Sequence, residues 1–322
     1  MSQKVVVFSQ IDPVILEKLK AQYQVVCIDP KQGDINEQIR NEVQDADGMI
    51  GAGRLLNAQN LSAANNLKII STVSVGYDNY DVDYLNQQKI WLAHTPHVLT
   101  ETTADLAFSL LMSAARQVAH LDTWTKQGQW KRTVGSAQFG VDVFGKTLGI
   151  IGLGNIGAAI ARRGFYGFNM NILYHNRTEK LEIAEAFKAQ YKSLNELLEQ
   201  SDFVVVAVDL NENSKALIGA EQFAHMQKHA VFVNIARGSV VDEQALIAAL
   251  KAKQIFAAGL DVYVKEPLQE SELFGLENVV TLPHIGSATA ETRFKMADLA
   301  YRNLVQALAG QQPKYLVNPK FI

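Results

Sequence analysis

The chain lacks the features that mark disulfide-bonded, membrane-spanning or nucleic-acid-binding proteins. It has one cysteine, Cys27, among 322 residues, which excludes an internal disulfide and indicates a reducing compartment. No apolar run approaches the roughly 18 residues of a membrane-spanning helix, and the N-terminal run VVVF is too short for a signal peptide. A net charge of −3 offers no basic surface for nucleic acid or anionic membrane. We therefore expect a cytoplasmic protein, in which Cys27 is buried within the strand-like run YQVVCID.

Short β-branched runs alternate with amphipathic helical segments along the whole chain. In the first hundred residues the runs lie at 5–8, 23–28, 48–52, 67–73 and 90–95. A second series lies at 147–153, 171–175, 203–208, 230–235, 257–262 and 278–283. This alternation is typical of parallel sheets with helices on both faces, and the length suits two cores. We predict an α/β protein with two doubly wound parallel-sheet domains.

Two long helices are expected near the domain crossings. Residues 100–121 are apolar on most of the helix circumference, which predicts one helix buried between domains or subunits. Residues 288–310 form a second helix that ends at Gly310. No Pro- or Gly-rich linker is visible, so we expect ordered crossings near 98–101 and 285–289.

A glycine motif follows the strand TLGII and precedes an amphipathic helix. Gly152, Gly154 and Gly157 give the G-x-G-x-x-G spacing of a dinucleotide-binding turn. The first glycine suits a tight turn, the second the approach of a pyrophosphate, and the third close packing of helix on strand. The amides near Asn155 and Ile156 would then face the phosphates at the helix N-terminus. The alternative is a glycine-rich turn in a domain that binds no nucleotide.

The next strand predicts which dinucleotide binds. An acidic residue that holds the ribose is expected about 20 residues after the last glycine, and the residue 19 positions after Gly157 is Asn176. Asn176 removes the repulsion that a carboxylate would exert on a 2′-phosphate. Arg177 can bind that phosphate, and Thr178 adds a hydroxyl. We predict that NADPH is preferred and NADH possible; the alternative is a surface arginine beside a permissive NAD site.

Ionisable residues follow three later strands of the same series. Arg237 comes after the strand at 230–235, Asp261 and Glu266 after the next, and His284 after the last. Ligands bind at the carboxyl ends of parallel strands, so these side chains are expected to converge on one cleft. Each taken singly is more simply a surface or structural residue. Their common position beside a dinucleotide favours catalysis.

In these motifs the chain resembles the D-isomer-specific 2-hydroxyacid dehydrogenases. The matching segments cover most of the chain, in order, at 71–83, 94–107, 146–157, 232–243, 257–268 and 282–293. The resemblance implies a Rossmann NADP-binding domain at 100–286, inserted into a flavodoxin-like substrate domain formed by 1–99 and 287–322. It also implies a homodimer.

The resemblance implies roles for individual residues. The catalytic set falls on Arg237, Glu266 and His284. The substrate carboxylate is expected at the backbone of Val75 and Gly76, and Arg54, after a predicted strand, is a weaker substrate candidate against a surface role. Nicotinamide contacts fall on Thr103 and Asp261. Further cofactor contacts are expected at Ile235, Ala236, Arg237, His284 and Gly286.

The activity implied is NADPH-dependent reduction of small 2-oxo acids to D-2-hydroxy acids. Candidate substrates are glyoxylate, hydroxypyruvate and 2-keto-D-gluconate, with His284 as general acid. Two alternatives stay open: a dinucleotide-sensing binding protein like the C-terminal-binding corepressors, or a dehydrogenase of another D-2-hydroxy acid. No metal site is expected, because His225 and His229 lack a third ligand nearby.

Two positions depart from the pattern of the family. Asp209 stands where a proline is usual, at a strand end near the expected adenosine site, and it could weaken a preference for NADPH. Gln138-Phe139 stands where close relatives carry Trp followed by an aromatic residue.

Overall fold

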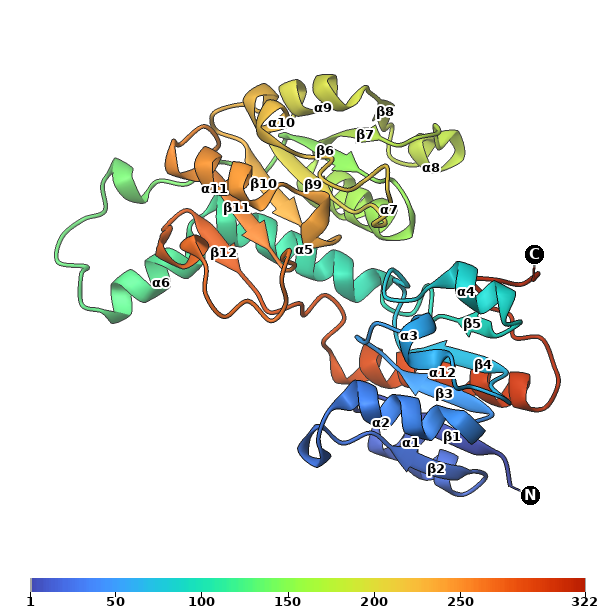
Figure 1. Cartoon of the computed structure of the whole chain (residues 1–322). Coiled ribbons are helices and arrows are strands. Elements are labelled where there is room, and N and C mark those ends of the chain that lie inside the picture. The colour runs from blue at the N-terminus through green and yellow to red at the C-terminus, as the bar shows by residue number, and fades with distance from the viewer. Residues whose placement is uncertain (1, 322) are drawn as a thin grey trace. The chain divides into compact units, whose positions relative to one another are not determined.

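The computed structural model describes residues 2–321, which form two compact units that each contain one parallel sheet (Figure 1). Residues up to 99 and from 288 onward make the smaller unit, and residues 100–287 make the larger unit. The chain returns to the smaller unit between residues 287 and 288, one residue later than the predicted boundary between 286 and 287. The prediction of two parallel-sheet α/β domains is confirmed.

The smaller unit has the flavodoxin-like strand order β2-β1-β3-β4-β5, with every neighbouring pair parallel. Helices α1 and α12 pack on one face of the sheet, and α2, α3 and α4 pack on the other. The strands are β1 (Lys4–Val7), β2 (Gln24–Cys27), β3 (Gly48–Gly51), β4 (Ile69–Thr72) and β5 (Trp91–Ala93). The helices are α1 (Pro13–Lys20), α2 (Ile35–Glu42), α3 (Ala58–Leu61), α4 (Val82–Gln87) and α12 (Ala290–Leu308).

The larger unit has the strand order β12-β11-β10-β9-β6-β7-β8, again all parallel. Helices α5 and α7 cover one face, and α9, α10 and α11 cover the other. The strands are β6 (Thr147–Ile151), β7 (Asn171–His175), β8 (Gln190–Tyr191), β9 (Phe203–Val206), β10 (Val231–Asn234), β11 (Ala257–Leu260) and β12 (Val279–Thr281). The helices are α5 (Thr100–Ala115), α6 (Val118–Lys126), α7 (Asn155–Arg162), α8 (Leu181–Glu185), α9 (Leu194–Gln200), α10 (Ala220–His225) and α11 (Glu243–Lys251).

The order of the larger sheet fixes where a ligand can bind. The chain runs outward from β6 through β7 to β8, then returns to β9 on the other side of β6. In parallel sheets of this kind the loops at such a switch point leave in opposite directions, so a ligand is expected at the carboxyl edge between β6 and β9. Strands β6, β9, β10 and β11 are buried along nearly their full length, as a sheet covered on both faces requires.

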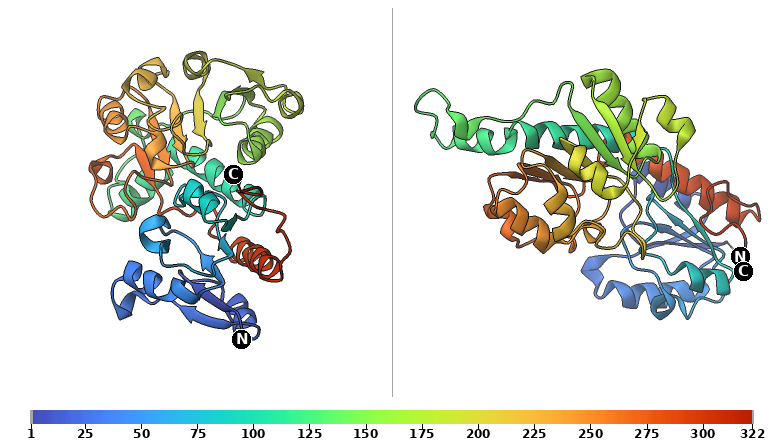
Figure 2. Two further views of the ribbon diagram at one scale, coloured as in Figure 1. Left: turned by 45° about the vertical axis from the view of Figure 1, so that its right-hand side comes forward. Right: turned by 90° about the horizontal axis from the view of Figure 1, so that it is seen from above.

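The prediction of a single helix over 100–121 is wrong, because the segment forms two helices. Helix α5 ends at Ala115, Gln117 adopts a left-handed backbone with φ of 52°, and α6 has no buried residue. The cause is a later segment that folds back over the end of α5, where the N–H of Val141 donates to the carbonyl oxygen of Ala115 at 2.9 Å. The chain between α5 and β6 therefore forms an arm, residues 118–144, which extends away from the sheet and returns to it at Val141 and Val143 (Figure 2).

The prediction that Cys27 is buried is also wrong. Its side chain is exposed, because β2 is the edge strand of its sheet and pairs only with β1. Strand β8 has only two residues, too few for a sequence pattern to reveal. Within residues 2–321, no helix has both the length and the apolar character needed to cross a membrane.

Candidate active site

The glycine-rich turn has the backbone geometry that a pyrophosphate site needs. Gly152 has φ of 105°, a value that side chains strongly disfavour, and a Cβ there would lie 2.5 Å from the carbonyl oxygen of Ala207. A Cβ on Gly157 would lie 2.1 Å from the carbonyl oxygen of Gly152, so α7 packs tightly on the turn. A Cβ on Gly154 would meet nothing within 4 Å, which leaves open space where helix α7 begins. Open space at a helix N-terminus fits a dinucleotide pyrophosphate.

Asn176 ties the end of β7 to this turn. Its Oδ1 accepts the N–H of Leu153 at 2.7 Å, so the asparagine holds the turn in place. It also lacks the negative charge that an acidic residue would carry at this position. Tyr191 on β8 donates its hydroxyl to the carbonyl oxygen of Asn176 at 3.1 Å and fixes the same strand end from the other side.

Arg177 and Thr178 extend from this fixed strand end. Both residues are exposed, and within residues 2–321 the guanidinium of Arg177 makes no hydrogen bond or ion pair. An exposed guanidinium next to this fixed strand end is suited to bind an anion from solvent. Asp209 is likewise exposed, beyond the end of β9.

Asp261 holds the loop that follows β12. It is 2% exposed, and its two carboxylate oxygens accept the N–H groups of Ile285 at 2.7 Å and Gly286 at 2.8 Å. Burial raises the pKa of Asp261, and the two N–H bonds oppose that rise. Thr103 donates its hydroxyl to the carbonyl oxygen of Gly286 at 2.9 Å. Both residues expected to contact the nicotinamide thus support the loop beside His284, and their contact with cofactor remains a prediction.

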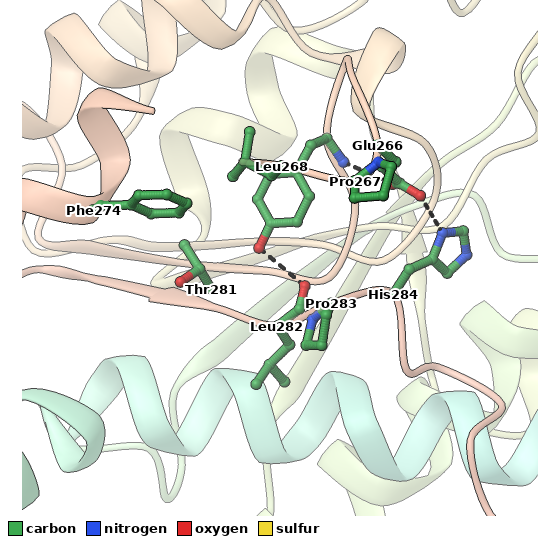
Figure 3. Close-up of a pocket in the computed structure, with 9 residues that line it drawn as sticks. Glu266, Pro267, Leu268, Phe274, Thr281, Leu282, Pro283 and His284 are labelled. Carbon is green, nitrogen blue, oxygen red and sulfur yellow. Dashed lines mark hydrogen bonds and ion pairs between the residues drawn. The ribbon is translucent and has the colours of Figure 1, made fainter. Parts of the chain in front are cut away.

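Glu266 and His284 meet as a hydrogen-bonded pair (Figure 3). Oε2 of Glu266 lies 2.7 Å from Nδ1 of His284. Burial alone would raise the pKa of Glu266, but bonds from His284 and from the N–H of Tyr263, with the charges of His284 and Arg237, together lower it. The carboxylate therefore stays ionised and orients the imidazole. The His284 side chain remains 47% exposed, so its other nitrogen is accessible to a reactant.

His284 itself has a left-handed backbone, with φ of 53°. That conformation costs a non-glycine residue on the order of 1–2 kcal/mol. The neighbouring bonds of Asp261 to the backbone hold it there. A cavity of about 420 Å³ borders the pair and has apolar walls from Leu268, Phe274 and Leu282. The apolar walls lower the local polarity on that side of the pair.

Arg237 leaves the end of β10 from a turn set by Asn234. The buried amide of Asn234 accepts the N–H of Ala236 at 3.0 Å and donates to the carbonyl oxygen of Arg237 at 3.1 Å. Ile235 and Ala236 are buried in this turn, and Arg237 is half-buried. Its charge acts on Glu266, so the larger unit brings all three predicted catalytic residues together at one sheet edge.

The predicted substrate residues of the smaller unit form a braced loop after β4. The carbonyl oxygen of Val75 lies 3.0 Å from Nδ1 of His94, and that of Gly76 accepts the hydroxyl of Ser74 at 2.6 Å. Arg54 lies half-buried in the loop after β3. Their roles toward substrate remain predictions.

His225 and His229 each contact a different carboxylate. His225 Nδ1 lies 2.8 Å from Glu199 Oε1, and His229 Nε2 lies 2.6 Å from Asp202 Oδ1. Helix α10 ends at His225, so the two histidines do not share one helical face.

Comparison with known proteins identifies the family. A model of the D-isomer-specific 2-hydroxyacid dehydrogenase NAD-binding domain matches residues 108–286. The chain belongs to this family. Glyoxylate/hydroxypyruvate reductase B of Escherichia coli K12 is 46% identical over 323 residues, 99% of each chain, and that of Cronobacter sakazakii is 45% identical over all of each chain.

Solved structures of this dehydrogenase family share the fold. The NADPH-dependent glyoxylate/hydroxypyruvate reductase of Sinorhizobium meliloti, solved with NADP and malonate, has a TM-score of 0.88 and 32% identity over 100% of this chain and 98% of that one. A glyoxylate reductase from Paecilomyes thermophila has a TM-score of 0.87 and 32% identity over 98% of each chain. The resemblance read from the sequence motifs is therefore confirmed, and the chain is an oxidoreductase of the 2-hydroxyacid dehydrogenase family.

Sequence motifs did not reveal the residues that brace this site. Asn234 and Tyr263 make the bonds that shape the Arg237 and Glu266 loops. For Asn234 the signal was a polar residue at the end of the otherwise apolar strand AVFVN, whereas Tyr263 carried no such signal.

Proposed function

We propose that this protein reduces small 2-oxo acids, above all glyoxylate and hydroxypyruvate, to D-2-hydroxy acids with NADPH. The observation that supports this most is the Glu266–His284 pair beside Arg237, on the sheet edge that also carries the dinucleotide turn. The similarity to named glyoxylate/hydroxypyruvate reductases over nearly the full chain supports the substrate class. 2-Keto-D-gluconate is a further candidate substrate.

The roles of the three side chains follow from their chemistry. The bound nicotinamide supplies the hydride that the C2 carbonyl receives. His284 donates a proton to the carbonyl oxygen as negative charge develops there, a role worth roughly 10²–10⁴-fold in rate. Glu266 orients the imidazole and favours its protonated form. Arg237 binds the substrate carboxylate and polarises the carbonyl.

Cofactor choice is assigned to the end of β7. We infer that Arg177 binds the 2′-phosphate of NADPH with help from the Thr178 hydroxyl, and that Gly154 admits the pyrophosphate. The Sinorhizobium meliloti relative was solved with NADP, which supports the use of that cofactor. Asp209 is exposed beyond β9, where its charge would weaken the preference for NADPH if it faced the adenosine.

The protein is further proposed to form a homodimer through the arm, residues 118–144. Exposed apolar side chains concentrate there: Val118, Trp130, Val134, Phe139 and Phe144 are 48–71% exposed. Such a concentration is typical of an interface.

Cytoplasmic location stays a prediction from the single cysteine.

A kinetic panel tests the reaction. Glyoxylate and hydroxypyruvate are expected to oxidise NADPH, which absorbance at 340 nm follows directly. His284→Ala should lower kcat by at least about 100-fold while NADPH still binds, because the general acid is lost. If NADPH binds but no 2-oxo acid is reduced, the result would contradict the proposed reductase activity and favour the dinucleotide-sensing alternative.

Arg177→Ala is expected to raise KM for NADPH about 10- to 100-fold, the worth of a charge-assisted phosphate contact. KM for NADH should change little, since that cofactor lacks the 2′-phosphate. Arg293→Ala, which removes another exposed arginine, is the control. Equal effects on both cofactors would make Arg177 a surface charge.

Sedimentation velocity measures the subunit count. We expect twice the mass of the chain at micromolar concentration, and a shift to single chains in Trp130→Asp, because a charge would be buried at the interface. Leu181→Asp introduces the same charge at an exposed residue of α8 and should leave the mass unchanged. A wild-type protein of single-chain mass would overturn the dimer.

A further inference from the structure

The hydroxyl of Tyr263 joins the loop of Glu266 to the loop of His284. It donates to the carbonyl oxygen of Leu282 at 3.0 Å and lies 3.2 Å from the carbonyl oxygen of Leu260. Leu260 is the last residue of β11, and Leu282 precedes His284 by two residues. In Figure 3, one dashed line ends at the carbonyl oxygen of Leu282, the acceptor of the Tyr263 hydroxyl, and another joins Glu266 to His284. The two bonds join the same pair of loops at different points.

The backbone of Tyr263 contacts the other two catalytic loops. Its N–H donates to Oε1 of Glu266 at 3.0 Å, while the other carboxylate oxygen bonds His284. A Cβ on Gly238 would lie 1.8 Å from the carbonyl carbon of Tyr263, so the turn that follows Arg237 packs directly on this residue. One residue thus touches the loops of Arg237, Glu266 and His284.

The strained backbone of His284 explains why such a brace is needed. A left-handed residue other than glycine persists only where its surroundings fix it. Asp261 fixes the chain after His284, through the N–H groups of Ile285 and Gly286. Tyr263 fixes the chain before it, through the carbonyl oxygen of Leu282.

We propose that Tyr263 is a positioning residue for the reaction, one that sets the separation between Glu266 and His284. The inference rests on the proposed reductase function for its kinetic consequence, but the brace itself does not. Without the hydroxyl, the segment from Leu282 to His284 can move away from Glu266. The imidazole then loses both its orientation and part of the negative charge that favours its protonated form.

Tyr263→Phe isolates the hydroxyl. The ring stays, and both carbonyl oxygens keep a second donor: the N–H of His284 bonds Leu282 at 3.1 Å, and the N–H of Leu282 bonds Leu260 at 2.8 Å. The variant should therefore fold, with a small loss in Tm. Tyr166→Phe is the matched control, because its hydroxyl bonds the carbonyl oxygen of Ala186 at 3.2 Å, outside the site.

In Tyr263→Phe, kcat for a 2-oxo acid should fall about 10- to 100-fold, the usual effect of a misplaced catalytic group. KM for NADPH should not change. The alkaline limb of the kcat profile should move to lower pH, because the imidazolium is less stabilised. The charged groups that face the pair, Arg237 and Asp261, are the same in both proteins, so the shift reports the Glu266–His284 contact.

Tyr166→Phe should match wild type in kcat and in pH profile. The inference is overturned if Tyr263→Phe keeps its kcat, if kcat falls without a shift of the alkaline limb, or if KM for NADPH rises as much as kcat falls. Amide hydrogen exchange of Ile285 and Gly286 gives a second readout, which should accelerate in Tyr263→Phe but not in Tyr166→Phe. If the wild type reduces no 2-oxo acid, the proposed function fails, whereas unchanged exchange would overturn the brace alone.

Discussion

The hydrogen bond between Glu266 and His284 is the interaction on which the rest of the site depends. It joins loops that leave β11 and β12, neighbouring parallel strands whose carboxyl ends meet at one edge of the sheet. Arg237 reaches the same edge from β10. In an antiparallel arrangement these strand ends would alternate between opposite edges. The parallel sheet therefore brings the three groups together, and the bond turns proximity into a fixed orientation.

Several polar residues hold that orientation, and none of them needs to meet a substrate. Asp261, Thr103 and Tyr263 bond the backbone on either side of His284, whose left-handed conformation would otherwise relax. Asn234 shapes the turn before Arg237, and Asn176 does the same for the glycine-rich turn. Support of a reactive group by neighbours that are themselves hydrogen-bonded is what a catalytic geometry requires. Burial raises the pKa of Asp261, which shows that placing a carboxylate there has a cost.

The sequence predicted the parts of this account that depend on local chemistry or chain order. Strand–helix alternation predicted both sheets, and the spacing from Gly157 placed Asn176 at the end of β7, the strand end proposed to select the cofactor. Long-range contacts escaped prediction. The end of α5 depends on Val141, and the exposure of Cys27 depends on which strand lies at the sheet edge. The bond from Tyr263 to Leu282 spans nineteen residues and carries no sequence motif.

Removing the charge of Glu266 tests the account most directly. Glu266→Gln keeps the shape of the side chain and removes the negative charge that favours the protonated imidazole, so the alkaline limb of the kcat profile should move down by about one pH unit or more, where each unit corresponds to about 1.4 kcal/mol. Glu199→Gln alters the similar pair with His225, 2.8 Å apart, and should leave the profile unchanged. An alkaline limb at the wild-type pH in Glu266→Gln would contradict the central role of the Glu266–His284 bond.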